Sequence, residues 1–440
     1  MNVKGGATMK EHSLLQNNRQ LRLLLAFAIL LVGGIFFTPT KAFAVELVED
    51  VMPWGYDYPN TYYVTNMEEL NEAFGGNHLI NGQTLILQEN VELDHDIMID
   101  YFVGNNCIID LNGKTIKKNS GYFLILGRAL EAGADFVQLI GKGRIVSDEG
   151  AYLFWDDSVG YRLILSGDIV YRTSGEFFTT IKNLTIENGD FKEIARTNES
   201  GDTVDDIRIG DMEGAFDGEV AITGGRFRSR LHFDTYRCTI TGGIFEKDIS
   251  IARGTSAISG GVIKGSVGFR GKLTVKENAY IRDGIVLKGE TGTCIIKGGY
   301  IGGKKYAIYI LADGEDPDQD YVTLNITGGT IESRSKNGYG IYCGGTPPCR
   351  VTIKNCTIHS KNGNGKSAIY LKDAQSVKLK ADAGKKTLIK GFKYGLVDKN
   401  GGGVKIDKKA VVKASLTKKK YTSKDKLDKT IKGNLTIYSE

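Results

Sequence analysis

The sequence predicts an all-β fold in which short strands of one chain stack into a parallel β-helix, or solenoid. One observation is a repeat, because the motifs ITGGRF, ITGGIF and ISGGVI begin at Ile222, Ile240 and Ile258, a spacing of 18 residues. A second is that residues within each repeat are β-branched or aromatic and alternate in polarity, which is typical of strands. A unit this short cannot bury its own apolar side, so neighbouring units must stack around a shared core.

The first 44 residues have the pattern of a signal peptide. Lys10, Arg19 and Arg22 precede the apolar run LLLAFAILLVGGIFF, and KAFA then supplies a small-x-small cleavage pattern. We therefore expect cleavage after Ala44 and a secreted protein, extracellular or at the cell surface, with no membrane span after cleavage. An uncleaved membrane anchor is the alternative.

Residues 45–80 are expected to form an N-terminal capping segment. Within it, NMEELNEAF is the clearest helix signal of the mature chain, since Asn66 and Glu69 have the spacing of a capping box. A short helix is therefore expected at this end of the solenoid.

Residues 81–416 are expected to form the β-helix itself. The first repeat series continues with IKGGYI at Ile296, ITGGTI at Ile326 and the degenerate IKNCTI at Ile353. A second series follows one loop later, with YAIYI, YGIYC, SAIYL and YGLVD around Ile308, Ile341, Ile369 and Leu396.

The early segments QTLILQENVELDHDIMI and CIIDLNGKTIKKN, with the preceding YYVTNMEELNEAF, resemble the start of right-handed parallel β-helix domains of the pectate-lyase-like superfamily. The ITGGTI repeats are similar to those of secreted bacterial surface proteins with this fold. The resemblance implies a single-stranded right-handed parallel β-helix whose open end is covered by a short helix. It does not imply a reaction, because one superfold carries many functions.

Six cysteines support this register. Cys107, Cys238 and Cys294 each lie two residues before an aliphatic anchor of a strand, so we expect them to point inward with it. Cys343, Cys349 and Cys356 are crowded around CGGTPPC, and one disulfide among them is expected in an oxidising compartment.

A stripe of charge in GGRFRSRLHFDTYRC raises the question of catalysis. Alternation places Phe227, Ser229, Leu231 and Phe233 on one side, and the stripe on the other side consists of Arg226, Arg228, Arg230, His232 and Asp234. The 18-residue period sets Arg228 over Glu246 and Arg230 over Asp248 as opposite-charge neighbours, and leaves Arg226 beneath Ile244 and Val262. We therefore interpret most of the stripe as the solvated side of an ordinary strand.

The alternative is a polysaccharide lyase or glycoside hydrolase that acts on an acidic polysaccharide. Proton abstraction beside a carboxylate needs a cation and a base, and the candidates for these roles are Arg226, His232 and Asp234. The WIDH and RxPxxR segments of pectate lyases and the polygalacturonase set NTD, DD, GHG and RIK are missing. We therefore expect a non-catalytic protein, with an unfamiliar active site as the second hypothesis.

Ligand binding is expected on the polar loops that follow Ile296. SRSKNG and SKNGNGK occupy equivalent positions one coil apart and contain Ser333, Lys336, Asn337, Asn362 and Asn364, residue types that suit sugar hydroxyls or uronates. Tyr306 adds an aromatic face for sugar stacking, and Trp155, Tyr161 and Tyr300 are further candidates. Ordinary turn chemistry would also account for such loops.

Calcium is the one cofactor that the sequence suggests. The stretch DGEDPDQD supplies five carboxylates, from Asp313, Glu315, Asp316, Asp318 and Asp320. Calcium takes six to eight oxygen ligands, often from a flexible loop, although this spacing is not that of an EF-hand. A solvated acidic loop is the alternative.

Residues 417–440 are expected to form a lysine-rich cap over the last coil. From Lys372 to Glu440 the chain has 19 lysines and seven acidic residues. Such a tail discourages strand pairing at the open end and would also adhere to anionic polymers. Together these features favour a cell-surface or matrix protein that binds a polysaccharide or cell-wall polymer, and not one that binds nucleic acid specifically.

Overall fold

The computed structural model describes residues 61–70, 84–99, 106–126, 136–147, 151–156, 161–179, 181, 183–197, 203–210, 218–234, 237–312, 322–335, 337–345, 349–360, 367–372, 374–385, 387–391, 394–398, 404–406 and 410–414. The chain divides into two units, Met1–Asp57 and Tyr58–Glu440, and all described residues lie in the second. The predicted signal peptide and lysine-rich cap therefore lie outside the described residues.

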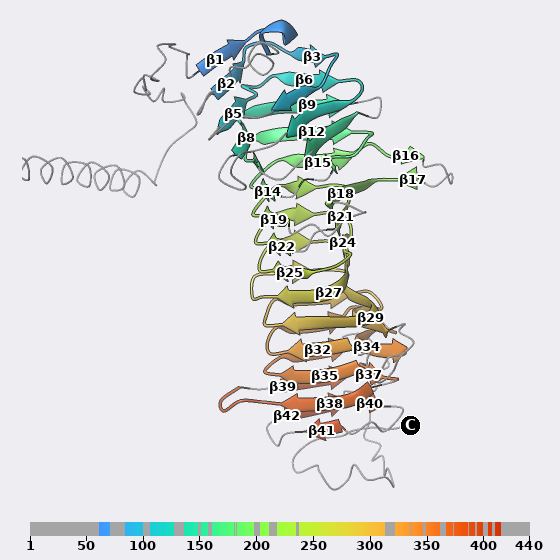
Figure 1. Cartoon of the computed structure of the whole chain (residues 1–440). Coiled ribbons are helices and arrows are strands. Elements are labelled where there is room, and N and C mark those ends of the chain that lie inside the picture. The colour runs from blue at the N-terminus through green and yellow to red at the C-terminus, as the bar shows by residue number, and fades with distance from the viewer. Residues whose placement is uncertain are drawn as a thin grey trace, which may run out of the picture. The chain divides into compact units, whose positions relative to one another are not determined.

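The second unit is an all-β parallel β-helix, as the repeat predicts. Each coil contributes a strand to each of three stacks of parallel strands, and the coils lie one on the next (Figure 1). We call these stacks the first, second and third faces, in the order in which the chain visits them. Only one hairpin, β16 (Arg196–Thr197) with β17 (Thr203–Val204), is antiparallel among the described strands.

The strands of each face are as follows. The first face consists of β1 (Thr61–Val64), β2 (Thr84–Leu87), β5 (Cys107–Asp110), β8 (Phe136–Ile140), β11 (Arg162–Leu165), β14 (Asn183–Ile186), β19 (Glu219–Ile222), β22 (Arg237–Ile240), β25 (Thr255–Ile258), β32 (Val322–Ile326), β35 (Cys349–Lys354), β38 (Ala374–Lys380) and β41 (Val404–Ile406). The second face consists of β3 (Val91–Leu93), β6 (Thr115–Lys118), β9 (Lys142–Ser147), β12 (Asp168–Thr173), β15 (Asp190–Glu193), β20 (Arg226–Phe227), β23 (Ile244–Phe245), β26 (Val262–Ile263), β28 (Tyr280–Ile281), β30 (Tyr300–Gly303), β33 (Thr330–Ser333), β36 (Thr357–Ser360), β39 (Thr387–Gly391) and β42 (Ala410–Ala414).

The third face consists of two parts. It begins with β4 (Ile97–Ile99), β7 (Tyr122–Leu126), β10 (Tyr152–Asp156) and β13 (Phe178–Thr179). It continues with β18 (Asp206–Gly210), β21 (Arg230–Asp234), β24 (Ile249–Ile251), β31 (Tyr306–Ala312), β34 (Tyr339–Gly345), β37 (Ser367–Leu371) and β40 (Tyr394–Asp398). Two long strands, β27 (Val267–Val275) and β29 (Ile285–Ile296), begin on the third face and turn the corner onto the first.

The N-terminal end is covered by a helical turn over residues 67–70. The carboxamide oxygen of Asn66 accepts a bond of 2.9 Å from the Glu69 amide, and the Glu69 carboxylate accepts one of 2.6 Å from the Thr65 amide. The predicted capping pair therefore forms, but the Glu69 carboxylate binds the amide of Thr65, whereas in a standard capping box it would bind the amide of Asn66. Leu70 is buried in the core. Strand β1 already pairs in parallel with β2, so the β-helix begins within the segment 45–80.

The interior follows the predicted register. Ile222, Ile240 and Ile258 are in register on consecutive first-face strands and are fully buried. Cys238 and Cys294 are buried beside this column, as the sequence predicts. These columns form one continuous core, to which each coil adds side chains at equivalent inward positions.

The repeated GG pair has a steric cause. A Cβ on Gly242 would lie 2.0 Å from the carbonyl oxygen of Thr223 in the preceding coil, a distance that no real side chain tolerates. The next residue, Gly243, has a φ of 92°, a left-handed conformation that favours glycine. Each GG turn therefore needs its first glycine for close stacking and its second for backbone conformation.

Candidate functional site

The charged stripe lies across a corner of the β-helix. Phe227, Ser229, Leu231 and Phe233 are buried, which confirms the predicted alternation. Arg226, however, belongs to β20 on the second face, whereas His232 and Asp234 belong to β21 on the third. The three catalytic candidates are therefore divided between two faces.

The arginines of the stripe form ion pairs, but with partners other than those that the repeat predicts. Arg226 binds the Glu246 carboxylate, with Nε 2.7 Å from Oε1, although we expected it to be the unmatched member. Arg228 makes two bonds of 2.6 and 2.5 Å to Asp190 in the preceding coil, and not to Glu246. Long side chains reach diagonal neighbours across strands, which explains the difference.

The remaining predicted pair is also different. Arg230 lies 3.4 Å from Asp206, while Asp248 accepts bonds from the amide and hydroxyl of Ser266. The bond from Arg226 is the largest cause that lowers the pKa of Glu246, so this carboxylate remains charged at neutral pH. Such pairing supports a structural role for most of the stripe.

His232 and Asp234 are the one catalytic pair that the structure brings together. Their side chains approach to 3.1 Å between Nε2 and Oδ2, with exposed fractions of 29% and 11%. Arg208 is in register with His232 on the neighbouring strand β18. An imidazole beside a carboxylate is an arrangement that can move a proton.

A cluster of five tyrosines is the most distinctive feature of the outer surface. It comes from three consecutive strands of the third face, β31, β34 and β37, and we call it the tyrosine platform: Tyr306, Tyr309, Tyr339, Tyr342 and Tyr370. All but Tyr339 are partly exposed. Tyr306 is the only member that we selected from the sequence.

The register of the strands places these tyrosines together. Ile308 and Ile341 point inward and are paired, so their successors Tyr309 and Tyr342 point outward and are paired as well. Tyr370 continues the same column on β37. Tyr306 and Tyr339 form a second, adjacent column.

The rings of the platform contact one another closely. The Tyr306 and Tyr309 centroids are 4.6 Å apart at an interplanar angle of 13°, and those of Tyr342 and Tyr370 are 5.2 Å apart at 7°. Tyr306 also lies 5.0 Å from Tyr342, which joins the two stacked pairs. The result is an aromatic surface that extends over three coils.

Charge at the edge of the platform comes from a lysine. The Lys305 ammonium lies 5.1 Å from the centroid of the Tyr306 ring. The hydrogen bond to Tyr306 is the main cause that raises the pKa of Lys305, so this side chain is cationic. Burial, with the neighbouring phenols, raises the pKa of Tyr339 to about 12, so the phenol of Tyr339 is neutral at physiological pH.

The first of the two predicted polar loops, the one before β34, lies beside this platform. Tyr339 donates from its amide to the Lys305 carbonyl at 2.7 Å, which places the loop before β34 next to the loop before β31. Asn337 is exposed there. Ser333 and Ser360 are in register, as predicted. Ser333 is fully buried, however, so its hydroxyl cannot contact a ligand at the surface. Lys336, Asn362 and Asn364 lie outside the described residues.

Of the other aromatic candidates, one is buried and two are partly exposed. Tyr161 is fully buried and cannot stack on a surface sugar. Trp155 and Tyr300 are partly exposed, and Tyr300 stacks on Tyr280 at 4.9 Å on the second face.

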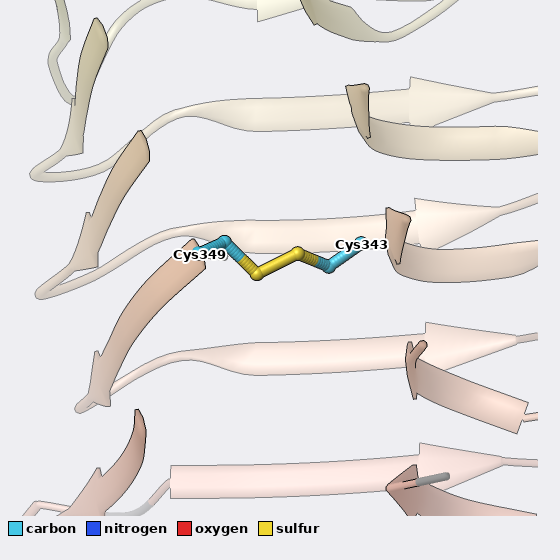
Figure 2. The surroundings of a disulfide bond; sticks show 2 residues. All are labelled: Cys343 and Cys349. Atoms are coloured by element: carbon cyan, nitrogen blue, oxygen red, sulfur yellow. A yellow bond between two sulfur atoms is a disulfide. The ribbon is translucent and has the colours of Figure 1, made fainter. Parts of the chain in front are cut away.

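One disulfide is present, between Cys343 in the second half of the platform strand β34 and Cys349 at the start of β35. Figure 2 shows this bond joining one strand to another. The sequence left its pairing open among three cysteines, and Cys356 has a buried free thiol. The bond fixes the corner that follows Tyr342.

Within the described ranges, no group of three or more His, Cys, Asp or Glu side chains is arranged to hold a metal ion. The proposed calcium loop, Asp313 to Asp320, lies outside those ranges. None of the helical segments that the structure describes is long and apolar enough to cross a membrane.

The chain matches no known family model, no curated protein and no solved structure.

The platform was hidden in the sequence because its tyrosines are far apart along the chain. Tyr309, Tyr342 and Tyr370 are separated by 33 and then 28 residues, so no constant period marks them. A signal was nevertheless present, since the motifs YAIYI, YGIYC and SAIYL each carry a tyrosine directly after the central isoleucine. Aligning those isoleucines would have found the tyrosine column.

Proposed function

We propose that this protein is a secreted, non-catalytic surface or matrix protein that binds a carbohydrate polymer on the tyrosine platform. The observation that carries the proposal is a cluster of five tyrosines from three coils, four of which present partly exposed rings at the surface. Aromatic rings combine a large apolar face with a polar hydroxyl, which suits sugars that have apolar C–H faces and polar edges. Solenoids bind ligands on extended surfaces of this kind.

The surroundings of the platform suit the same ligand. Lys305 and Asn337 are exposed at its edge and can bind sugar hydroxyls or a uronate carboxylate. The predicted signal peptide and the Cys343–Cys349 disulfide fit an oxidising, extracellular location. The resemblance to pectate-lyase-like β-helices of secreted bacterial surface proteins points to the same setting.

Binding to immobilised polysaccharides tests this proposal. The panel contains neutral polymers (cellulose, xylan, chitin) and uronate polymers (polygalacturonate, alginate). We expect Tyr342→Ala to weaken binding at least about tenfold, because truncating a central aromatic anchor typically costs more than 1.4 kcal/mol.

Tyr280→Ala is the matched control. Tyr280 is also an outward tyrosine stacked on a neighbour, but it lies on the second face. It should retain binding, and circular dichroism should show both variants folded. Unchanged binding by the double variant Tyr309→Ala/Tyr342→Ala would overturn the proposal.

A polysaccharide lyase or hydrolase is the second candidate, favoured by the approach of His232 to Asp234. A lyase leaves an unsaturated uronate, which absorbs ultraviolet light. Incubation with the uronate polymers, with calcium or with a chelator, therefore tests it. Turnover that is lost in His232→Ala would establish this candidate, and no absorbance change in either condition would exclude a lyase.

A further inference from the structure

A second aromatic cluster lies near the N-terminal end of the β-helix. Tyr122 stacks on Tyr152 at 5.0 Å and on Trp155 at 4.9 Å, with interplanar angles of 24° and 25°. All three side chains are partly exposed and come from β7 and β10. We call these three residues the N-terminal aromatic patch. Its rings resemble the tyrosine platform in type, stacking and exposure.

The patch and the platform lie on the same face. Strands β7 and β10 pair with β13, which contacts β18, and β18 begins the ladder that leads to β31. Seven strand-to-strand steps separate β10 from β31. At a strand spacing of about 4.8 Å, the two sites lie about 34 Å apart.

The outward residues between the two sites are small or polar over several coils. His232 is followed in register by Ser250 and Gly268 on the next two strands. Gly268 has no side chain, and a Cβ there would make only ordinary van der Waals contacts, the nearest at 3.9 Å. The outward column therefore carries only small or polar residues from β21 to β27, and Val286 then leads to Tyr309 of the platform.

The charges beside the two sites have opposite signs. At the patch, Asp96 accepts a bond of 2.8 Å from the Tyr122 amide and pairs with the buried Lys118 at 3.2 Å. Burial is the largest cause that raises the pKa of Tyr122, and the charges of Glu176 and Asp96 raise it further, so the surroundings of the patch remain negative. At the platform the charge is that of Lys305. A polyanion would be attracted to one site and repelled by the other. A neutral polymer is favoured at both.

We propose that the third face is one binding track on which a single neutral, β-linked polysaccharide chain lies parallel to the axis of the β-helix, held at the platform and at the N-terminal aromatic patch. This inference rests on the proposed function. Sugars whose ring substituents are all equatorial, as in cellulose and chitin, present the flat faces that both sites require. Two linked sites bind one chain more tightly than either alone, because the second contact is intramolecular.

Fluorescence separates the two sites experimentally. The chain has two tryptophans, so the variant Trp54→Phe leaves Trp155 in the patch as the only one. This protein is titrated with cello- and chito-oligosaccharides of increasing length, while binding is followed independently by calorimetry. Chains too short to span about 34 Å should bind at single-site affinity. Longer chains should bind at least about tenfold more tightly and shift the Trp155 emission in the same titration.

Variants assign the gain to each site. Tyr122→Ala should return long chains to the affinity of short ones and leave short-chain binding at the platform intact. Tyr342→Ala should remove the platform contribution for all lengths. Tyr280→Ala on the second face should change neither.

The outcomes distinguish the two proposals. If Tyr342→Ala loses binding but affinity is independent of length and Trp155 emission is unchanged, the track is wrong and the platform stands. If Trp155 responds to sugar while Tyr342→Ala binds normally, the platform is wrong, and so is the two-site track. If Trp155 emission instead depends on protein concentration without sugar, a second copy of the chain covers the patch, and the proposal is overturned.

Discussion

At the scale of single residues, the ion pairs of the stripe differ in geometry and should differ in energy. Arg228 makes two bonds to Asp190 and its side chain is 36% exposed, whereas Arg230 makes one contact of 3.4 Å and is 52% exposed. Exposed pairs are worth little because solvent screens them.

We expect Arg228→Ala to lower the free energy of unfolding by up to about 1 kcal/mol, and Arg230→Ala by less. Denaturant unfolding measures both changes. A double-mutant cycle with Asp190→Ala isolates the pair, and coupling that is larger for Arg230 with Asp206 would contradict the geometry.

The thiols provide a second prediction for single residues. Burial raises the pKa of Cys107, Cys294 and Cys356 to about 12 and that of Cys238 further. Because the thiolate is the reactive form, these cysteines should resist iodoacetamide in the native protein.

Mass spectrometry counts the alkyl groups that are added. We expect none on the native protein, four after unfolding without reductant, and six after unfolding with reductant, since Cys343 and Cys349 are joined. Six without reductant would mean that this bond is absent.

The same residues show what can be predicted from the sequence. The alternation of Phe227 and Leu231 with charged neighbours, and the inward direction of Cys238, follow from the period of the strand and were predicted correctly. The partner of Arg228 was not, because strand period fixes where a Cβ points but not which diagonal neighbour a long side chain reaches. Arg226 and His232 were assigned to one side because the sequence does not show the corner between β20 and β21.

At the scale of elements, the GG turns should be the most sensitive positions. A methyl group on Gly242 would meet the Thr223 carbonyl oxygen at 2.0 Å, and because the neighbouring atoms are backbone of the preceding coil, they cannot easily move aside. We expect Gly242→Ala to lower the free energy of unfolding by more than about 2 kcal/mol, because overpacking and backbone strain have effects of this size.

Gly268→Ala is the control for this prediction. Gly268 lies within β27 and has room for a Cβ. Alanine at this position should leave the free energy of unfolding unchanged or raise it by up to about 1 kcal/mol, because alanine lowers the conformational entropy of the unfolded chain. Thermal and denaturant unfolding compare the two variants. Equal destabilisation by both would show that the clash is not the cause.

At the scale of the whole molecule, a solenoid is held together by contacts between neighbouring coils. Each coil contacts mainly the coil before and the coil after it, so stability is approximately a sum of local terms. No single sequence motif predicts the tyrosine platform, because the platform forms only when three coils of unequal length are stacked in register.

This local connectivity determines how far a defect spreads. Gly242→Ala acts in the turn between β22 and β23, several coils from the platform strands β31, β34 and β37. We expect hydrogen exchange to show lost protection in β19, β22 and β25, and native protection in β34 and β37, because each interface transmits only part of the perturbation. Carbohydrate binding at the tyrosine platform should persist in this variant under native conditions. A uniform loss of protection from β5 to β38 would instead mean that the β-helix unfolds as a single cooperative unit, and platform binding would then fall in parallel with the fraction of folded protein.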